Sequence, residues 1–124
     1  MVEDVIRLPW PNSILSSNSS AAWYKKAPVT KKARFDAFVL AKHNGVQKDP
    51  NAILEFTYHP PDRRKRDCQN VATMLKAYID GIADAMGVDD NGFRVKYPDQ
   101  FAEVIKGGCV LVSIRKDTEC SNSL

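Results

Sequence analysis

Residues 62–90 read DRRKRDCQNVATMLKAYIDGIADAMGVDD, and this stretch decides more about the fold than any other. Apolar residues recur in it every three or four positions, a spacing that predicts a helix over residues 70–86 with one buried face. The expected buried residues are Val71, Met74, Leu75, Tyr78, Ile79 and Ile82. Gly87 suits the left-handed conformation in which many helices end. A basic run precedes this helix, and two carboxylates follow it.

Segments on both sides of this helix alternate apolar and polar residues, which is typical of strands. The pattern predicts strands over residues 52–58, 93–97 and 109–115, with Leu54, Phe56 and Tyr58 on one face of the first. A further strand is expected over residues 2–8, before Pro9 and Pro11. Residues 12–28 are expected to form a loop. A helix capped by Thr30 should run to His43, before Asn44 and Gly45.

The composition is that of one ordinary globular domain. The chain has 124 residues, of which 44% are hydrophobic and 27% charged, so a single domain spanning residues 1–124 is expected. Its net charge of +3 is too small to establish a nucleic-acid partner. The sequence contains no apolar run of about 18 residues, which is the length that would predict a membrane span. The acidic N-terminal stretch differs from a secretory signal, which indicates a cytoplasmic protein.

The three cysteines, Cys68, Cys109 and Cys120, contain no CxxC pair, so they are expected to stay reduced and not to bind zinc. His59 precedes two prolines and is expected to be an ordinary loop histidine and not a metal ligand.

Asp67 lies beside four cations, which are Arg63, Arg64, Lys65 and Arg66. Taken alone it is best explained as a helix cap, worth about 0.5–2 kcal/mol. Lys76 and Asp80 are spaced as an exposed ion pair, and Asp89 and Asp90 begin an ordinary turn sequence. Together, however, carboxylates beside a basic run are what a metal-dependent enzyme acting on a phosphate backbone needs, because magnesium prefers oxygen ligands and arginine binds phosphate.

A second basic cluster comprises Lys25, Lys26, Lys31, Lys32 and Arg34. Its charges suit either a solvated helix face or phosphate contacts, and the sequence leaves both open. Trp10 and Trp23 flank the expected loop, where aromatic rings either anchor a loop to the core or stack on bases. Anchoring is the favoured role for Trp10.

Several of these segments occur in the same order in a known family. The chain resembles the RusA family of Holliday junction resolvases, particularly its phage-encoded members. The resemblance is carried by LPWP at residues 8–11, PDRRKRD at residues 61–67, Asn70, Lys76, Asp80-Gly81 and VDD at residues 88–90. The central block is the specific part.

The resemblance implies an α+β fold with a small mixed sheet and helices packed on it. It also implies a homodimer that binds four-way DNA junctions and cuts them symmetrically with magnesium or manganese. Asp67, Lys76 and Asp90 match the family's catalytic residues. Asp67, Gln69, Asp89 and Asp90 are the corresponding metal-ligand candidates. Residues Arg63, Arg64, Lys65, Arg66 and Asn70 are the DNA-binding candidates.

Gln69 departs from the family pattern, because it stands where the second aspartate of a D-x-D-N motif is expected. A carboxamide oxygen can still bind a cation, but the site loses one negative charge and should bind magnesium less tightly. An alternative is therefore a weakened or inactive junction-binding protein. A second alternative is that the basic segment binds RNA or an acidic protein.

Overall fold

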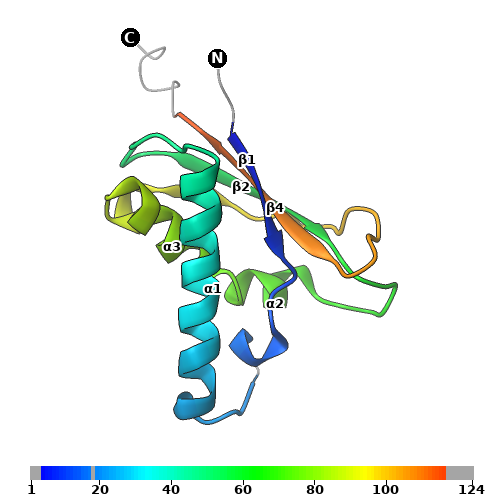
Figure 1. Cartoon of the computed structure of the whole chain (residues 1–124). Coiled ribbons are helices and arrows are strands. Elements are labelled where there is room, and N and C mark those ends of the chain that lie inside the picture. The colour runs from blue at the N-terminus through cyan, green and yellow to red at the C-terminus, as the bar shows by residue number, and fades with distance from the viewer. Residues whose placement is uncertain (1–3, 18, 117–124) are drawn as a thin grey trace.

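The computed structural model describes residues 4–17 and 19–116 of the chain. Their elements are β1 (Asp4–Pro9), η1 (Ser13–Leu15), α1 (Trp23–His43), β2 (Ile53–His59), α2 (Cys68–Thr73), α3 (Lys76–Met86), η2 (Asp90–Gly92), β3 (Arg94–Lys96) and β4 (Cys109–Arg115). The helices α1 and α3 lie side by side on one face of the sheet (Figure 1). This arrangement is a small α+β domain, as expected.

The sheet is mixed, with strand order β1-β4-β2-β3. The strand β4 pairs antiparallel with both β1 and β2, whereas β3 pairs parallel with β2. Val112 lies opposite Ile6 on one side and Phe56 on the other, and all three are buried. The helices therefore cover this face, and the alternating residues of β2 point the other way, as its sequence pattern predicted.

The predicted strand bounds differ from the observed ones by a few residues. Residues 109–115 form β4 as predicted, β2 is shifted by one residue, and β3 is shorter than residues 93–97. Residues 2 and 3 lie outside the described residues. Pro9, expected to follow the first strand, is its last residue and lies opposite Cys109. Proline is tolerated there because β1 is an edge strand.

The helix α1 begins seven residues before the predicted Thr30 cap, so the prediction of a loop over residues 12–28 is wrong for its last part. Pro28 lies inside this helix, where it cannot donate to the carbonyl four residues earlier. No residue in 23–32 is buried, so water can satisfy that carbonyl instead. The predicted end is confirmed, with His43 as the last residue and Gly45 at a φ of 70°.

The buried side of α1 consists of small residues. Ala33, Ala37 and Ala41 are buried, whereas Phe35 is 61% exposed. On α3, a Cβ added to Gly81 would lie only 2.2 Å from the backbone oxygen of Arg34. The backbones of the two helices therefore approach closely, with Gly81 at the point of contact.

The predicted helix over residues 70–86 is two helices, α2 and α3, because the chain turns at Met74 and Leu75. The hydroxyl of Thr73 donates to the carbonyl of Asn70 at 2.6 Å, a local bond that competes with helix continuation. The predicted core residues are nevertheless all buried, and Gly87 ends α3 at a φ of 73°. Gln69 and Thr73 therefore belong to α2, whereas Lys76 and Asp80 belong to α3. Within residues 4–17 and 19–116, no helix is long and apolar enough to cross a membrane.

Candidate active site: an acidic cleft beside an ion-pair network

An open cleft of about 700 Å³ lies where the start of α2 faces the segment that follows β3. Its walls are formed by Arg66, Asp67, Cys68, Gln69, Ala72, Tyr97, Pro98, Asp99, Gln100 and Phe101. The two segments meet because β3 pairs in parallel with β2, so the C-terminal ends of both strands lie on the same side of the sheet. The C-terminal end of β2 leads into α2. Three of the predicted site residues, Arg66, Asp67 and Gln69, therefore share one cavity.

Asp67 caps α2. One of its carboxylate oxygens accepts a hydrogen bond from the backbone N–H of Gln69 at 3.0 Å, as the simple capping interpretation predicted. The Asp67 side chain also borders the cleft, so capping does not remove it from the solvent. A carboxylate has room for further bonds after accepting one hydrogen bond. The two roles weighed for Asp67 are therefore compatible.

Asp99 is a carboxylate of the cleft that the sequence analysis missed. Burial raises the pKa of the Cys68 thiol, and the negative charges of Asp67 and Asp99 raise it further. Both carboxylates therefore act on the same thiol from the cleft wall. The sequence signal for Asp99 was weak, because Tyr97-Pro98-Asp99 resembles an ordinary turn after a strand.

The basic run before Asp67 divides into two kinds of residue. Arg66 is only 17% exposed, pairs with Asp62 at 2.9 Å and lies 5.6 Å from the centre of the Trp10 ring. It therefore holds the loop and the LPWP segment in place. The side chains of Arg63, Arg64 and Lys65 are exposed, with no ion-pair partner among the described residues. These three cations remain available to an anion.

Asn70 is engaged within the protein. Its side-chain oxygen accepts a hydrogen bond from the hydroxyl of Ser16 at 2.5 Å, which ties the segment after η1 to α2. The backbone N–H of Ser17 donates to the hydroxyl of Thr73 at 3.1 Å and strengthens this link. The structure thus gives Asn70 a positioning role, whereas its predicted DNA contact stays a prediction.

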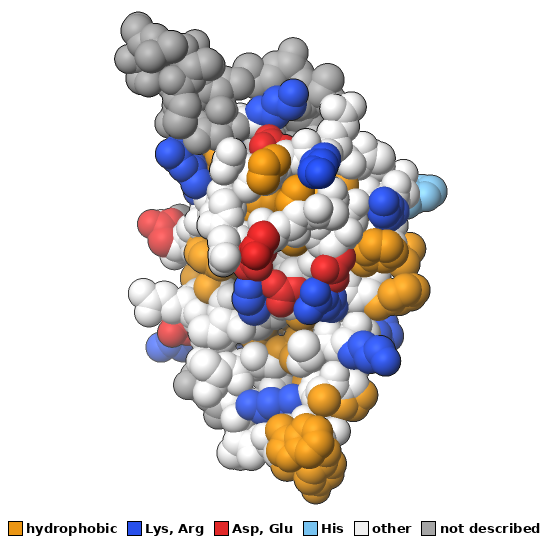
Figure 2. Space-filling model, turned by 90° about the vertical axis from the view of Figure 1, so that its left-hand side faces the viewer, with side chains coloured by type: hydrophobic (Ala, Val, Ile, Leu, Met, Phe, Trp, Pro, Cys, Tyr) orange, Lys and Arg blue, Asp and Glu red, His pale blue; other side chains and the backbone are white. Residues whose placement is uncertain are grey.

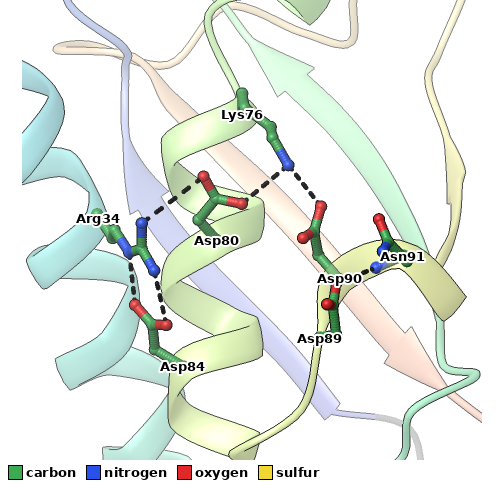
Figure 3. A network of polar contacts seen from close by, with 7 residues as sticks. All are labelled: Arg34, Lys76, Asp80, Asp84, Asp89, Asp90 and Asn91. Atoms are coloured by element: carbon green, nitrogen blue, oxygen red, sulfur yellow. Dashed lines mark hydrogen bonds and ion pairs between the residues drawn. The ribbon is translucent and has the colours of Figure 1, made fainter.

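Lys76, the first residue of α3, lies between two carboxylates (Figure 3). Its Nζ is 2.9 Å from Asp80 and 2.5 Å from Asp90. The hydrogen bond from Lys76 lowers the pKa of Asp90, and the same bond, followed by that to Asp80, raises the pKa of Lys76. The Lys76–Asp80 pair was predicted from its spacing, but the contact with Asp90 comes from the fold. Asp89 caps η2 by accepting from the backbone N–H of Asn91 at 2.9 Å.

The network continues from α3 to α1 through Arg34. This guanidinium donates to both carboxylate oxygens of Asp84, at 2.6 and 2.9 Å, and lies 4.0 Å from Asp80 (Figure 3). The bond from Arg34 lowers the pKa of Asp84. Arg34 was grouped with the lysines of the second basic cluster, but it serves to join two helices. Figure 2 shows acidic and basic side chains alternating across this part of the surface.

The predicted catalytic and metal-ligand residues therefore fall into two groups. Asp67 and Gln69 line the cleft, whereas Lys76 and Asp90 lie in the network and do not line it. Tyr97 connects the two, since it borders the cleft and the charge of Lys76 acts on its hydroxyl. Among the described residues, no group of three or more His, Cys, Asp or Glu side chains is arranged to hold a metal ion.

Trp10 anchors the chain as expected, whereas His59 is the last residue of β2 and not a loop residue. Trp10 packs against the hydrophobic core, and the Nδ1 atom of His59 lies 2.9 Å from the backbone oxygen of Glu103. Cys68 and Cys109 are free thiols, and Cys120 lies outside the described residues. Trp23, by contrast, is 78% exposed, and its ring contacts that of Tyr24.

The sequence is 34% identical over 119 residues to an uncharacterized protein of Xylella fastidiosa (strain Temecula1 / ATCC 700964). The alignment covers 92% of this chain and 77% of that protein. The two chains belong to one family. No known family profile matches the sequence.

Proposed function

We propose that this protein is a metal-dependent endodeoxyribonuclease that resolves four-way DNA junctions, as the resemblance to the RusA family implies. The observation that carries the proposal is the cleft with two carboxylates, Asp67 and Asp99, directly after a loop with three unpaired cations. An enzyme that hydrolyses a phosphodiester needs oxygen ligands for a cation and positive charge to hold the polyanion. This part of the surface offers both.

The loop cations would position the DNA. Arg63, Arg64 and Lys65 are free to contact phosphates, which fixes the register of the duplex without reading its bases. Arg66 would act indirectly, because its contacts with Asp62 and Trp10 hold the loop that carries the other three. Selectivity for a junction would then come from shape and from the spacing of two sites in a homodimer.

The cleft offers magnesium or manganese suitable oxygen donors, from the carboxylates of Asp67 and Asp99 and the carboxamide of Gln69. Asp90 is the further candidate that the family resemblance supplies, with Asp89 beside it. When bound, the metal would activate water and offset charge on the phosphate. Lys76 is 64% exposed, so its ammonium could exchange a carboxylate partner for a phosphate oxygen. The proposed place of action is the cytoplasm of a bacterial or phage-infected cell.

The test is cleavage of a synthetic four-way junction with magnesium and with manganese. Asp67→Asn and Asp90→Asn should each abolish cutting and leave junction binding intact or tighter, because each removes a ligand charge that faces the DNA. Glu55→Gln is the matched control, since this carboxylate pairs with Arg115 on the open face of the sheet, away from the helices. Cutting by either Asn variant at the wild-type rate would disprove the site.

A second function, junction binding without cleavage, is favoured by one observation. Gln69 lines the cleft where the resemblance implies an aspartate, so the site has one negative charge fewer for a cation. Tight, structure-selective binding with no nicks in either metal would support this function. Equal affinity for RNA or linear duplex at the same salt concentration would argue against both.

A further inference from the structure

The exposed side of α1 carries large aromatic residues that contact one another, and of these only Phe38 is among the described residues packed against the core. Trp23, Tyr24 and Phe35 are 78%, 61% and 61% exposed. The rings of Trp23 and Tyr24 meet edge to face with their centres 6.4 Å apart, and Phe35 stacks on Phe38 at the same distance. Soluble proteins rarely expose several such rings together without a binding role. In Figure 2 hydrophobic side chains form the bottom tip of the molecule, with basic side chains above them.

Helical spacing arranges part of this surface as a stripe. Tyr24, Lys31 and Phe35 are separated by seven and four residues, so they lie along one side of α1. Ala33, Ala37 and Ala41 define the buried side, which faces elsewhere. The distance from Tyr24 to Phe35 along the axis is about 16 Å, at 1.5 Å per residue. A flexible ligand of several repeating units would span it.

The charges on α1 are strongly one-sided. Its sequence contains six Lys and Arg residues and one acidic residue, Asp36. Asp36 pairs with Lys32 at 2.8 Å. In the described part of the chain, Lys25 and Lys31 have no ion-pair partner, and Lys26 donates only to the backbone oxygen of Ser19. Unpaired cations therefore lie beside the exposed rings.

We propose that this outer side of α1 binds single-stranded DNA, with unpaired bases stacked on Trp23 and Tyr24 and phosphates held by Lys25 and Lys31. Single strands combine flat apolar bases with a repeated negative charge, which matches alternating rings and cations. A second copy of this chain would place unpaired lysines against each other. A lipid bilayer would bury Lys31 between two rings among acyl chains. The choice of DNA over RNA rests on the proposed function.

The test measures the affinity of the full-length protein for a fluorescent oligo-dT by anisotropy, in EDTA and at one stated salt concentration. Trp23→Ala combined with Tyr24→Ala should weaken binding by about tenfold or more, because base stacking on each ring is lost. Trp23→Phe combined with Tyr24→Phe should retain most of the affinity, since the stacking surfaces remain. Val5→Ala is the matched control, because Val5 is 52% exposed on β1.

The charges are tested separately. Lys25→Gln and Lys31→Gln should each flatten the slope of log affinity against log salt by about 0.7, the value for one phosphate contact on a single strand. Oligo-dT binding that is absent in wild type, or unchanged in the double Ala variant, overturns the proposal. Equal or tighter binding to oligo-rU, or to vesicles of phosphatidylcholine and phosphatidylserine, also overturns it. Loss of a dimer in the double Ala variant, measured by sedimentation, does so as well. Because this probe contains no junction and no metal, failure of junction cleavage would leave its result intact.

Discussion

At the scale of single residues, the main finding is that capping and ligation are not alternatives for Asp67. A carboxylate that caps α2 through the N–H of Gln69 also faces the cleft. Lys76 differs from Asp67, because its charge is already paired with two carboxylates, those of Asp80 and Asp90. If Lys76 acts on phosphate, substrate must replace Asp90 or Asp80 as its partner. This exchange would cost little at an exposed site, where ion pairs contribute about 0–1 kcal/mol.

Gln69→Asp tests whether residue 69 is a metal ligand. A carboxylate there adds a charged oxygen ligand, so it should lower the magnesium concentration for half-maximal junction cutting by about tenfold, equivalent to about 1.4 kcal/mol. The measurement is a magnesium titration of the cleavage rate. Gln100→Asp is the control, because Gln100 lines the same cleft.

An equal shift with Gln100→Asp would assign the effect to the general charge of the cleft. No shift with Gln69→Asp would point to another carboxylate. Asp99→Asn should then raise the magnesium requirement if Asp99 supplies the missing charge, and Asp89→Asn if that residue does. Asp99 is the better candidate by position, since it lines the cleft with Asp67, whereas Asp89 caps η2.

At the scale of elements, the contact of α1 with α3 depends on Gly81. Gly81→Ala should destabilise the protein by about 1–3 kcal/mol, because the added methyl group meets the backbone oxygen of Arg34, which cannot move like a side chain. Urea unfolding, compared at a constant slope, measures the change. Helix propensity alone predicts the opposite sign, a gain of about 1 kcal/mol from glycine to alanine. A more stable variant would therefore show that the helices can separate at no cost.

The loop before α2 makes a different prediction. Arg63→Ala and Arg64→Ala should each weaken binding to junctions of every sequence, and each should lower the slope of log affinity against log salt by about 0.9. Both side chains are exposed and unpaired in the described structure, so neither change should alter stability. Arg7→Ala, on the exposed side of β1, is the control. Unchanged slopes would mean that the loop is only solvated.

At the scale of the whole molecule, the ion pairs Arg34–Asp84 and Lys76–Asp90 link different elements, and together with the local contacts of Asp62 they make stability depend on pH. The pKa values of Asp62, Asp84 and Asp90 are all lowered from 3.8, by a hydrogen bond from the backbone of Arg64, from Arg34 and from Lys76, respectively. The unfolded chain therefore binds protons more readily than the folded chain in this range. Stability is fully present above the unfolded pKa and is lost as the pH falls through the folded values.

The urea concentration at the midpoint of unfolding should accordingly decrease as the pH is lowered from about 5 to about 2. Arg34→Met should make this loss shallower, because it removes the partner that lowers the pKa of Asp84. Circular dichroism at each pH gives both curves. Parallel curves for the two proteins would show that the Arg34–Asp84 pair contributes nothing to acid sensitivity.

The sequence by itself determined the elements whose pattern is local. Alternation identified β2 and β4, helical spacing identified the core residues of α2 and α3, and Gly45 and Gly87 marked two helix ends. Pattern could not find the start of α1, because none of residues 23–32 is buried, so no stripe of buried apolar residues marks this part of the helix. It also could not show the break at Met74, since the apolar spacing continues across it.

Only the tertiary structure decided which polar residues meet. Asp99 reaches the cleft because β3 pairs with β2, and Asp90 reaches Lys76 because the chain turns back after Gly87. Arg34 bonds to Asp84, and not to a partner near the lysines, because small residues let α1 and α3 approach closely. The physical reason is that burial imposes a period on a sequence, whereas contacts between exposed charges depend on how distant elements pack and leave no such period.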